Sequence, residues 1–174
     1  MSQKRKRRWF QFSLRALLVF VLLASVGMSW FGVQLQRAKR QRMAVEAVEK
    51  VGGRIIDRQN GTQWVPEWAR ALFGDDFFDD VVQVSMDTED FGDDEAACLK
   101  ALDNLEWLRL AETQVTDAGL ENLKGLTNLE WLSLAGTQVT DAGLEHLKGL
   151  TNLTDLDLSG TQVSDAGIVH LEVL

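Results

Sequence analysis

Several residue types and motifs are scarce or missing in this sequence, and each absence narrows the range of functions. The 174 residues include no tyrosine, one proline and a single cysteine, Cys98, which excludes an internal disulfide. No glycine-rich phosphate loop follows a predicted strand, and GxSxG, HExxH and CxxC sequences are all absent. We therefore expect no enzyme activity, no metal site and no cofactor.

Charge is distributed unevenly along the chain. Residues 1–50 contain 11 Lys/Arg and 2 Asp/Glu, a net charge of +9, whereas residues 51–174 contain 7 Lys/Arg and 24 Asp/Glu, a net charge of -17. The chain is thus a basic N-terminal segment joined to an acidic body. Because an acidic body repels phosphate groups, we expect no nucleic acid among the partners.

An apolar run follows the basic tail of residues 1–15. No charged residue occurs between Arg15 and Arg37, and residues 16–33 are clearly apolar. At about 1.5 Å per residue this run spans about 27 Å of helix, close to the thickness of the bilayer core. We predict a transmembrane helix over 16–33 that acts as an uncleaved signal anchor. A cleaved signal peptide is the alternative, with Ser25-Val26-Gly27 as a weak cleavage sequence.

Basic residues on the two sides of this run indicate its orientation. Six Lys/Arg lie on its N-terminal side and four lie on its C-terminal side. The positive-inside rule then favours a cytoplasmic N-terminus and an extracytoplasmic acidic body, which contains the repeats described below. We accordingly expect a single-pass membrane protein.

Residues 34–52 continue the helical pattern beyond the apolar run. Four apolar residues recur at the i, i+3, i+4 and i+7 positions of one helix face: Ala44, Ala47, Val48 and Val51. The stripe is too short for a coiled coil, so we expect this juxtamembrane helix to dock onto the domain that follows. Gly52-Gly53 is expected to end it.

Residues 53–80 have the pattern of an N-terminal cap. Asn60-Gly61 lies between two strand-like segments and predicts a β-hairpin, because a type I′ turn requires positive φ at both central residues. Pro66 suits the first position of a short helix. We expect Trp68 and Leu72 on the buried side of that helix, so that this hairpin-helix cap covers the first open end of the following domain.

Most of the remaining sequence repeats itself with a period of 24 residues. Leucines recur with this period in three successive sets: Leu105, Leu129 and Leu153; Leu108, Leu132 and Leu156; and Leu110, Leu134 and Leu158. A degenerate copy precedes them, with apolar residues at the corresponding positions: Val81, Val84, Met86, Phe91, Ala96, Leu99 and Leu102. The copies are therefore 81–104, 105–128, 129–152 and an incomplete 153–174.

The repeat LxxLxLxxTxVTDAGLxxLxxLxN resembles the leucine-rich repeat family, in a variant of bacterial membrane-anchored proteins in which threonine replaces the usual asparagine. The resemblance covers residues 81–174 and implies an α/β fold. This fold is a short solenoid of about four repeats, with a parallel concave sheet and short helices outside. Stacking is needed because a single repeat cannot bury its own apolar face. The resemblance supplies a fold and little about activity.

Strand residues between the leucines are expected to face the concave surface in two columns: Gln83, Trp107, Trp131 and Asp155, then Ser85, Arg109, Ser133 and Asp157. Neighbouring strands lie about 4.8 Å apart, so Trp107 and Trp131 should lie side by side. Trp and Arg are enriched at binding hot spots. The alternative is that Trp131 merely duplicates Trp107 and that both rings cover strand edges.

Two functions from different classes follow from this arrangement. We predict a non-enzymatic, membrane-anchored protein-interaction module that binds a protein, or an envelope glycan, on the concave face. The alternative is a structural element that self-associates by stacking through its uncapped C-terminal repeat, since solenoids generally need capping repeats.

The other polar residues of the repeats are expected to serve the structure rather than chemistry. Hydroxyl side chains are expected to bond the adjoining turn or cap the short helices: Thr113, Thr137 and Thr161, then Thr116, Thr140 and Ser164. Aspartates are expected at the helix N-termini: Asp117, Asp141 and Asp165. The acidic segments 74–80 and 87–95 are expected to be solvated, since the second fails the calcium-loop pattern. His146 and His170 lack a third ligand, and Cys98 is expected to be a small buried residue.

Overall fold

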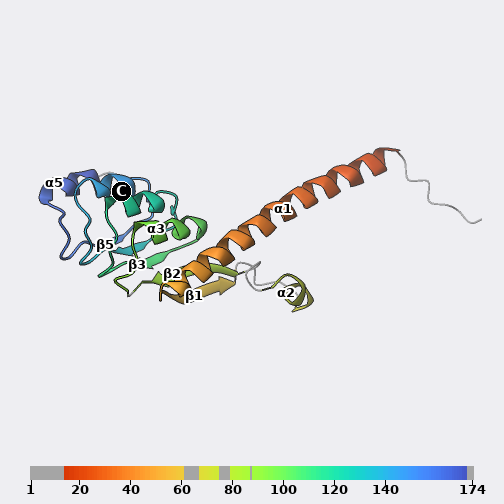
Figure 1. The fold of residues 1–174 in the computed structure, drawn as a ribbon. Helices are drawn as coiled ribbons and strands as arrows, with labels where there is room; N and C mark the ends of the chain where they lie inside the picture. Colours follow the sequence, from red (N-terminus) through yellow and green to blue (C-terminus); the bar gives the residue numbers. More distant parts are fainter. Residues whose placement is uncertain (1–13, 61–66, 75–78, 87, 172–174) are drawn as a thin grey trace, which may run out of the picture. The chain divides into compact units, whose positions relative to one another are not determined.

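The computed structural model describes residues 14–60, 67–74, 79–86 and 88–171 (Figure 1). The chain divides into two units, Met1–Gln36 and Arg37–Leu174. Helix α1, Leu14–Lys50, runs without a break through the described part of the first unit and into the second.

The described part of the first unit is helical and exposes apolar side chains, among them Leu22, Leu23 and Val26. Within the residues that the structure describes, no helix combines the length and apolar character needed to cross a bilayer. The transmembrane helix predicted over residues 16–33 is therefore not supported by those residues.

The second unit is built on one sheet whose described strands run in the order β1-β2-β3-β4-β5. Strand β1 is antiparallel to β2, and each later strand is parallel to the one before it. The bounds are Arg54–Asn60, Asp79–Ser85, Trp107–Arg109, Trp131–Ser133 and Asp155–Asp157. In the predicted Asn60-Gly61 turn, Asn60 is the last residue of β1 and Gly61 lies outside the described residues; the described partner of β1 is β2. The parallel sheet of an α/β solenoid is thus confirmed.

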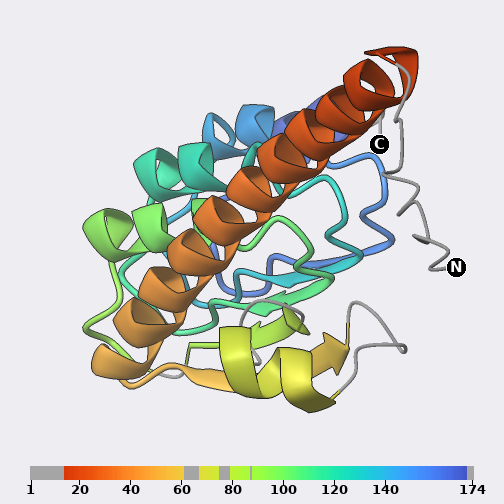
Figure 2. The same cartoon turned by 90° about the vertical axis from the view of Figure 1, so that its right-hand side faces the viewer.

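Short helices form a row on the side of the sheet opposite to the concave face, as Figures 1 and 2 show. Those between β2 and β5 connect each parallel strand to the next, since a parallel pair requires a crossover connection, and the last two follow β5. Their bounds are Asp93–Ala96 (α3), Ala97–Ala101 (η2), Asp117–Leu120 (α4), Glu121–Leu123 (η3), Gly143–Leu147 (η4), Asp165–Ile168 (α5) and Val169–Leu171 (η5). Many of them are 3-10 turns, which suit such short connections.

The repeated aliphatic positions lie between the sheet and these helices. In the copies 105–128 and 129–152 the strand leucines are fully buried, and so are the seven apolar residues named above for the degenerate copy 81–104. This confirms the predicted register of the four copies. In the last copy the corresponding leucines, Leu153, Leu156 and Leu158, are only half-buried, because no described strand follows β5.

The last turns of α1 cover the N-terminal end of this core. Ala44, Val45 and Val48 are buried there, and Val51 packs against the same core while half-buried. The docking predicted for residues 34–52 is therefore confirmed. The helix closes the end of the stack at which no earlier repeat is present to bury the degenerate copy.

The prediction that the next helix buries Trp68 and Leu72 is wrong. These two side chains of α2, Glu67–Phe73, are 68% and 70% exposed. The turns of α1 already occupy the end of the core, so α2 has no apolar surface there to cover. It is tied to β2 instead by an ion pair in which Arg70 Nη1 lies 2.9 Å from Asp79 Oδ1.

In each of the first three copies, an aspartate binds the first turn of the next copy's helix. Asp117 Oδ1 accepts a hydrogen bond from the Thr140 backbone N–H at 2.8 Å, and its Oδ2 accepts one from the Thr140 hydroxyl at 2.6 Å. The same pair of bonds joins Asp93 to Thr116 and Asp141 to Ser164. We call these three pairs the aspartate ladder.

The aspartate ladder also explains the glycine of the repeated DAG sequence. A Cβ atom built on Gly143 would overlap the carboxylate of Asp117, and the same holds for Gly119 with Asp93 and Gly167 with Asp141. Glycine is therefore required because the preceding repeat's carboxylate fills the space of a side chain. The hydroxyl of Thr116 or Ser164 meanwhile accepts a backbone N–H of its own helix, which confirms the predicted N-caps.

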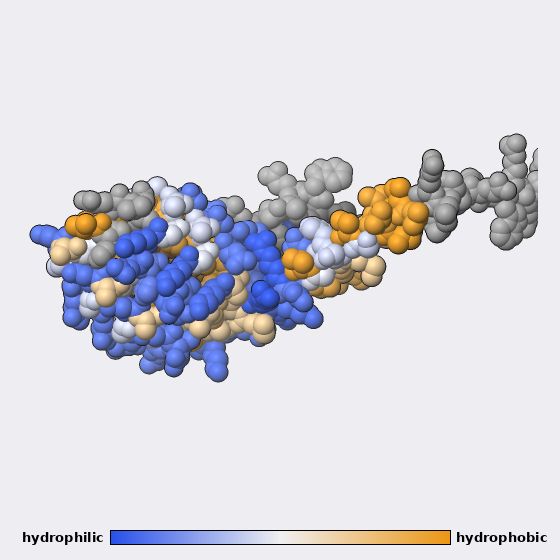
Figure 3. Space-filling view, turned by 90° about the horizontal axis from the view of Figure 1, so that it is seen from above, coloured by the Kyte–Doolittle hydropathy of each residue, from blue (hydrophilic) through white to orange (hydrophobic). Residues whose placement is uncertain are grey.

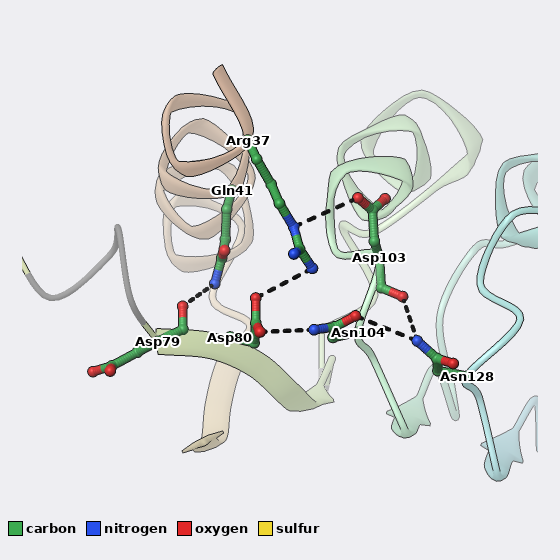
Figure 4. A network of polar contacts seen from close by, with 7 residues as sticks. All are labelled: Arg37, Gln41, Asp79, Asp80, Asp103, Asn104 and Asn128. Carbon is green, nitrogen blue, oxygen red and sulfur yellow. Dashed lines mark hydrogen bonds and ion pairs between the residues drawn. The ribbon is translucent and has the colours of Figure 1, made fainter. Parts of the chain in front are cut away.

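A second set of polar contacts joins α1 to the repeats at the N-terminal ends of the strands (Figure 4). Arg37 Nη2 lies 3.3 Å from Asp80 Oδ1, and Arg37 Nε lies 3.9 Å from Asp103 Oδ2. Asn104 donates to the same Asp80 carboxylate at 2.7 Å, and Asn128 donates to Asn104 Oδ1 at 3.3 Å. The helix, the start of β2 and the first two repeats are thus linked by one network.

Replacing Asp117 with alanine should reduce the free energy of unfolding by about 2–3 kcal/mol, because two hydrogen bonds to a charged acceptor are lost. Asp165 is the matched control. It holds the same position at its own helix N-terminus, but no described residue donates a hydrogen bond to it from a following repeat. Asp165→Ala should change stability by no more than about 0.5 kcal/mol. Urea unfolding followed by circular dichroism measures both, and equal losses would assign the effect to the helix terminus instead.

The concave face as a candidate binding site

The strand register brings the predicted concave residues together. Gln83 pairs with Trp107, Trp107 with Trp131 and Trp131 with Asp155. Ser85, Arg109, Ser133 and Asp157 form the second column in the same way. Successive side chains of a strand point to opposite faces, so the apolar residue between the two columns enters the core while both columns point the other way. Ser85 and Ser133 are nevertheless buried, 4% and 2% exposed, so the surface of this face is formed by the other residues of the columns. The register matches the prediction, while a binding role for these residues stays a prediction.

The two tryptophans at the middle of this face are stacked. The ring centroids of Trp107 and Trp131 lie 4.4 Å apart, with an interplanar angle of 7°. Parallel strands in register hold equivalent side chains about 4.8 Å apart, which is close to the distance at which two parallel rings touch. Both side chains are half-exposed. The pair therefore presents a rigid aromatic surface whose geometry is set by the sheet.

Charge changes sign across the face. Arg109 on β3 is exposed, and Arg54 on β1 pairs in register with Ser85, so this part of the face is basic. The β5 end carries Asp155 and Asp157. Such a polar gradient fixes the direction in which a charged partner segment can lie across the strands.

Asp157 is held in its charged form. The hydroxyl of Ser159 donates to Asp157 Oδ1 at 2.6 Å, the Ser159 backbone N–H donates to the same atom at 3.0 Å, and the Ser133 hydroxyl donates to Oδ2 at 3.2 Å. These hydrogen bonds, led by those from Ser159 and assisted by the charge of Arg109, lower the pKa of Asp157 below its ordinary value. Asp157, at the acidic end of the face, is therefore ionised at neutral pH.

The backbone conformation of Glu112, which follows β3 by three residues, was not predicted from the sequence. Its φ is +59°, a left-handed conformation that glycine adopts at the two equivalent positions, Gly136 (+70°) and Gly160 (+72°). Its carboxylate lies so close to Gly136 that a Cβ there would be 2.6 Å from Glu112 Oε1. A residue with a side chain costs about 1–2 kcal/mol in this conformation. The signal in the sequence is the glutamate at a position where the other repeats have glycine.

The remaining candidates of the sequence do not form a reactive site among the described residues. No group of three or more His, Cys, Asp or Glu side chains in that part of the chain is placed to hold a metal ion. His146 lies in η4, and the side chain of His170 is outside the described residues. Burial, with a smaller effect of Glu95, raises the pKa of the Cys98 thiol to about 11. A thiol that stays protonated at neutral pH is a poor nucleophile.

Comparison with known proteins agrees with the repeat architecture. A sequence model described as leucine rich repeat matches residues 103–163. No curated protein sequence matches the chain.

Two solved structures of similar proteins are both internalins of Listeria monocytogenes strain 4b F2365. One internalin is 25% identical over 45% of this chain and 29% of its own, with a TM-score of 0.33. Internalin C2 is 22% identical over 54% of this chain and 59% of its own, with a TM-score of 0.28. This chain therefore corresponds to less than two thirds of either protein, and TM-scores this low carry no conclusion about function. The sequence match and the repeated strand-and-helix units agree: residues 103–163 of this chain belong to the leucine-rich repeat family.

Proposed function

We propose that this protein is a non-enzymatic interaction module that binds a protein partner on its concave face. The observation that carries the proposal is the stacked pair of Trp107 and Trp131, half-exposed at the middle of that face. Large aromatic side chains held rigidly lose little conformational entropy when a partner covers them, which is why they serve as anchors at interfaces. Leucine-rich repeats supply a general precedent for protein binding, and the charged residues around the pair supply orientation.

The competing explanation is that the rings only shield the edges of the strands. Shielding by each other would satisfy one ring face of each tryptophan, but both side chains remain half-exposed. The face also contains an exposed Arg109 beside the pair, and arginine and tryptophan are the residue types most enriched at interface hot spots. These features favour a binding surface over a purely structural pair.

The double substitution Trp107→Ala/Trp131→Ala is expected to abolish partner capture, with a loss of affinity of more than about tenfold. The rings lie outside the repeat core, so folding should be retained. Partners captured from a lysate of the source cells by the wild-type and variant proteins are compared by quantitative mass spectrometry.

Trp68→Ala is the matched control, since Trp68 is equally aromatic and 68% exposed but lies on α2 rather than on the concave sheet. It should leave capture unchanged. A partner lost with Trp68→Ala and retained by the double variant would place the binding surface on α2 and contradict the proposal.

We also propose that residues 16–33 anchor the protein in a membrane, with the N-terminus in the cytoplasm and the repeats outside it. Apolar side chains of this helical segment are exposed, and Figure 3 shows hydrophobic residues gathered there while the described surface of the second unit is mainly hydrophilic. They include Leu18, Val19, Val21, Leu22, Leu23, Val26, Met28, Trp30 and Val33. Exposed apolar surface of this kind is costly in water, and basic residues flank it on both sides.

The variant Cys98→Ala/Val169→Cys tests this topology, since Val169 is 58% exposed and lies in the last repeat. A membrane-impermeant thiol reagent should label it in intact cells, after any outer envelope has been opened, and Cys98→Ala alone should give no labelling. Labelling only after lysis of the membrane would place the repeats in the cytoplasm.

Leu22→Arg/Val26→Arg should shift the protein from the membrane fraction to the soluble fraction, because two charges in an apolar span are strongly disfavoured.

A second candidate function is assembly through the last repeat. The specific observation is that Leu156 and Leu158 are only half-buried, whereas their counterparts Leu132 and Leu134 are fully buried. Among the described strands, β5 is paired on one side only. Light scattering over a range of protein concentrations distinguishes the two functions, because assembly requires a mass that rises with concentration and a binding module requires a saturable partner.

A further inference from the structure

The stacked tryptophans define a direction across the concave face. Trp107 and Trp131 lie on adjacent strands with nearly parallel rings 4.4 Å apart, and neighbouring strands are themselves about 4.8 Å apart. The stack therefore runs across the strands, one ring for each strand. One face of the Trp131 ring is covered by Trp107, and the opposite face is turned toward β5.

The next position in that direction holds a short acidic side chain. Asp155 pairs in register with Trp131 and is exposed. Its Oδ2 accepts one hydrogen bond from the Thr154 hydroxyl at 2.9 Å, which leaves further acceptor positions on the carboxylate. Because aspartate has no ring, the stack stops at Trp131. We name the position bounded by the second face of Trp131, Asp155 and Asp157 the open rung.

The open rung is negatively charged and has no basic residue of its own. Asp157 lies on the same face, two residues after Asp155, and is ionised at neutral pH. Residues 149–174 contain four Asp/Glu and no Lys/Arg. Within the column of Asp157, the basic residue is Arg109 on β3, with Ser133 between them. The open rung therefore combines an aromatic face with carboxylates that favour a cation.

We propose that the open rung takes the guanidinium group of an arginine of the protein partner. The proposal deepens the proposed function and rests on the concave face being the binding surface. A guanidinium is planar, so it can continue the stack on Trp131, and its fork of N–H donors matches a carboxylate. A lysine ammonium group has the same charge but is not planar, so it cannot stack on the Trp131 ring in this way. A sugar ring offers a stacking face but brings no positive charge to Asp155 and Asp157.

The test uses the full-length protein in detergent micelles and three synthetic hexapeptides, of arginine, lysine or glutamate. Binding is followed through the indole N–H signals of the protein in nuclear magnetic resonance, at about 0.15 M salt so that long-range attraction is screened. Hexa-arginine should shift the Trp131 signal and bind about fivefold more tightly than hexalysine, while hexaglutamate should not bind. Equal binding of the two basic peptides, or no binding of hexa-arginine, would overturn the arginine assignment.

Single substitutions separate stacking from charge. Trp131→Ala should weaken hexa-arginine binding about tenfold, and Trp131→Phe should retain most of it because an aromatic face remains. Asp155→Asn should weaken binding about fivefold. Asp165→Asn is the matched control, since it removes an exposed carboxylate of the same repeat on the helical side, and binding should stay within about twofold. An equal loss of affinity for hexa-arginine with Asp155→Asn and Asp165→Asn would mean that binding depends only on the overall charge of the protein.

The proposal of an arginine at the open rung and the proposal of a concave binding face can be disproved separately. A natural partner that requires Trp107 and Arg109 but tolerates Asp155→Asn keeps the binding face and overturns the arginine assignment. A partner that tolerates Trp107→Ala/Trp131→Ala overturns the binding face itself, whatever the peptides do.

Discussion

The rest of the structure depends on the bond between one repeat's aspartate and the next repeat's helix. Each carboxylate of the aspartate ladder accepts a backbone N–H and a hydroxyl from the following copy, as Asp117 does from Thr140. Such a two-point contact fixes both the distance between copies and their rotation. Because every copy is held in the same way, the strands come into register, and the register is what brings Trp107 and Trp131 into contact. A surface feature thus follows from an interaction on the opposite side of the sheet.

The N-terminal end of the stack is closed by different means. There is no earlier repeat to bury the degenerate copy, and the last turns of α1 do so with Ala44, Val45 and Val48. The network of Arg37, Asp80 and Asn104 then joins this helix to the strand ends. A solenoid needs such a cap because each repeat is stabilised mainly by its neighbours. Residues 37–50 of α1 are therefore also part of the folded domain.

Much of the second unit follows from the sequence because a period of 24 residues is a strong constraint. The buried leucines follow from that period, whereas the parallel sheet and its two concave columns follow from the resemblance to leucine-rich repeats, and the strand register agrees with both. The exposure of Trp68 was not predicted, since amphipathic spacing does not tell which surface is already covered by α1. The bonding of Asp117 to Thr140 was not predicted either, because a helix N-terminus and a neighbouring repeat attract the same carboxylate. Glu112 was missed because its backbone conformation shows only when its glycine counterparts are aligned with it.

The copies are alike at the residues of the aspartate ladder and differ on the concave face. The DAG sequence is identical in the copies 105–128, 129–152 and 153–174, since the carboxylate and the missing side chain fit each other. The concave columns, in contrast, read Trp, Trp and Asp, then Arg, Ser and Asp, over the same copies. Concave side chains point away from the core, and the contacts they make between copies differ along the stack: Trp107 stacks on Trp131, and Ser133 donates a hydrogen bond to Asp157. The sheet therefore provides equally spaced positions whose chemistry is free to vary, and the tryptophan pair beside two carboxylates is the arrangement that this chain has placed there.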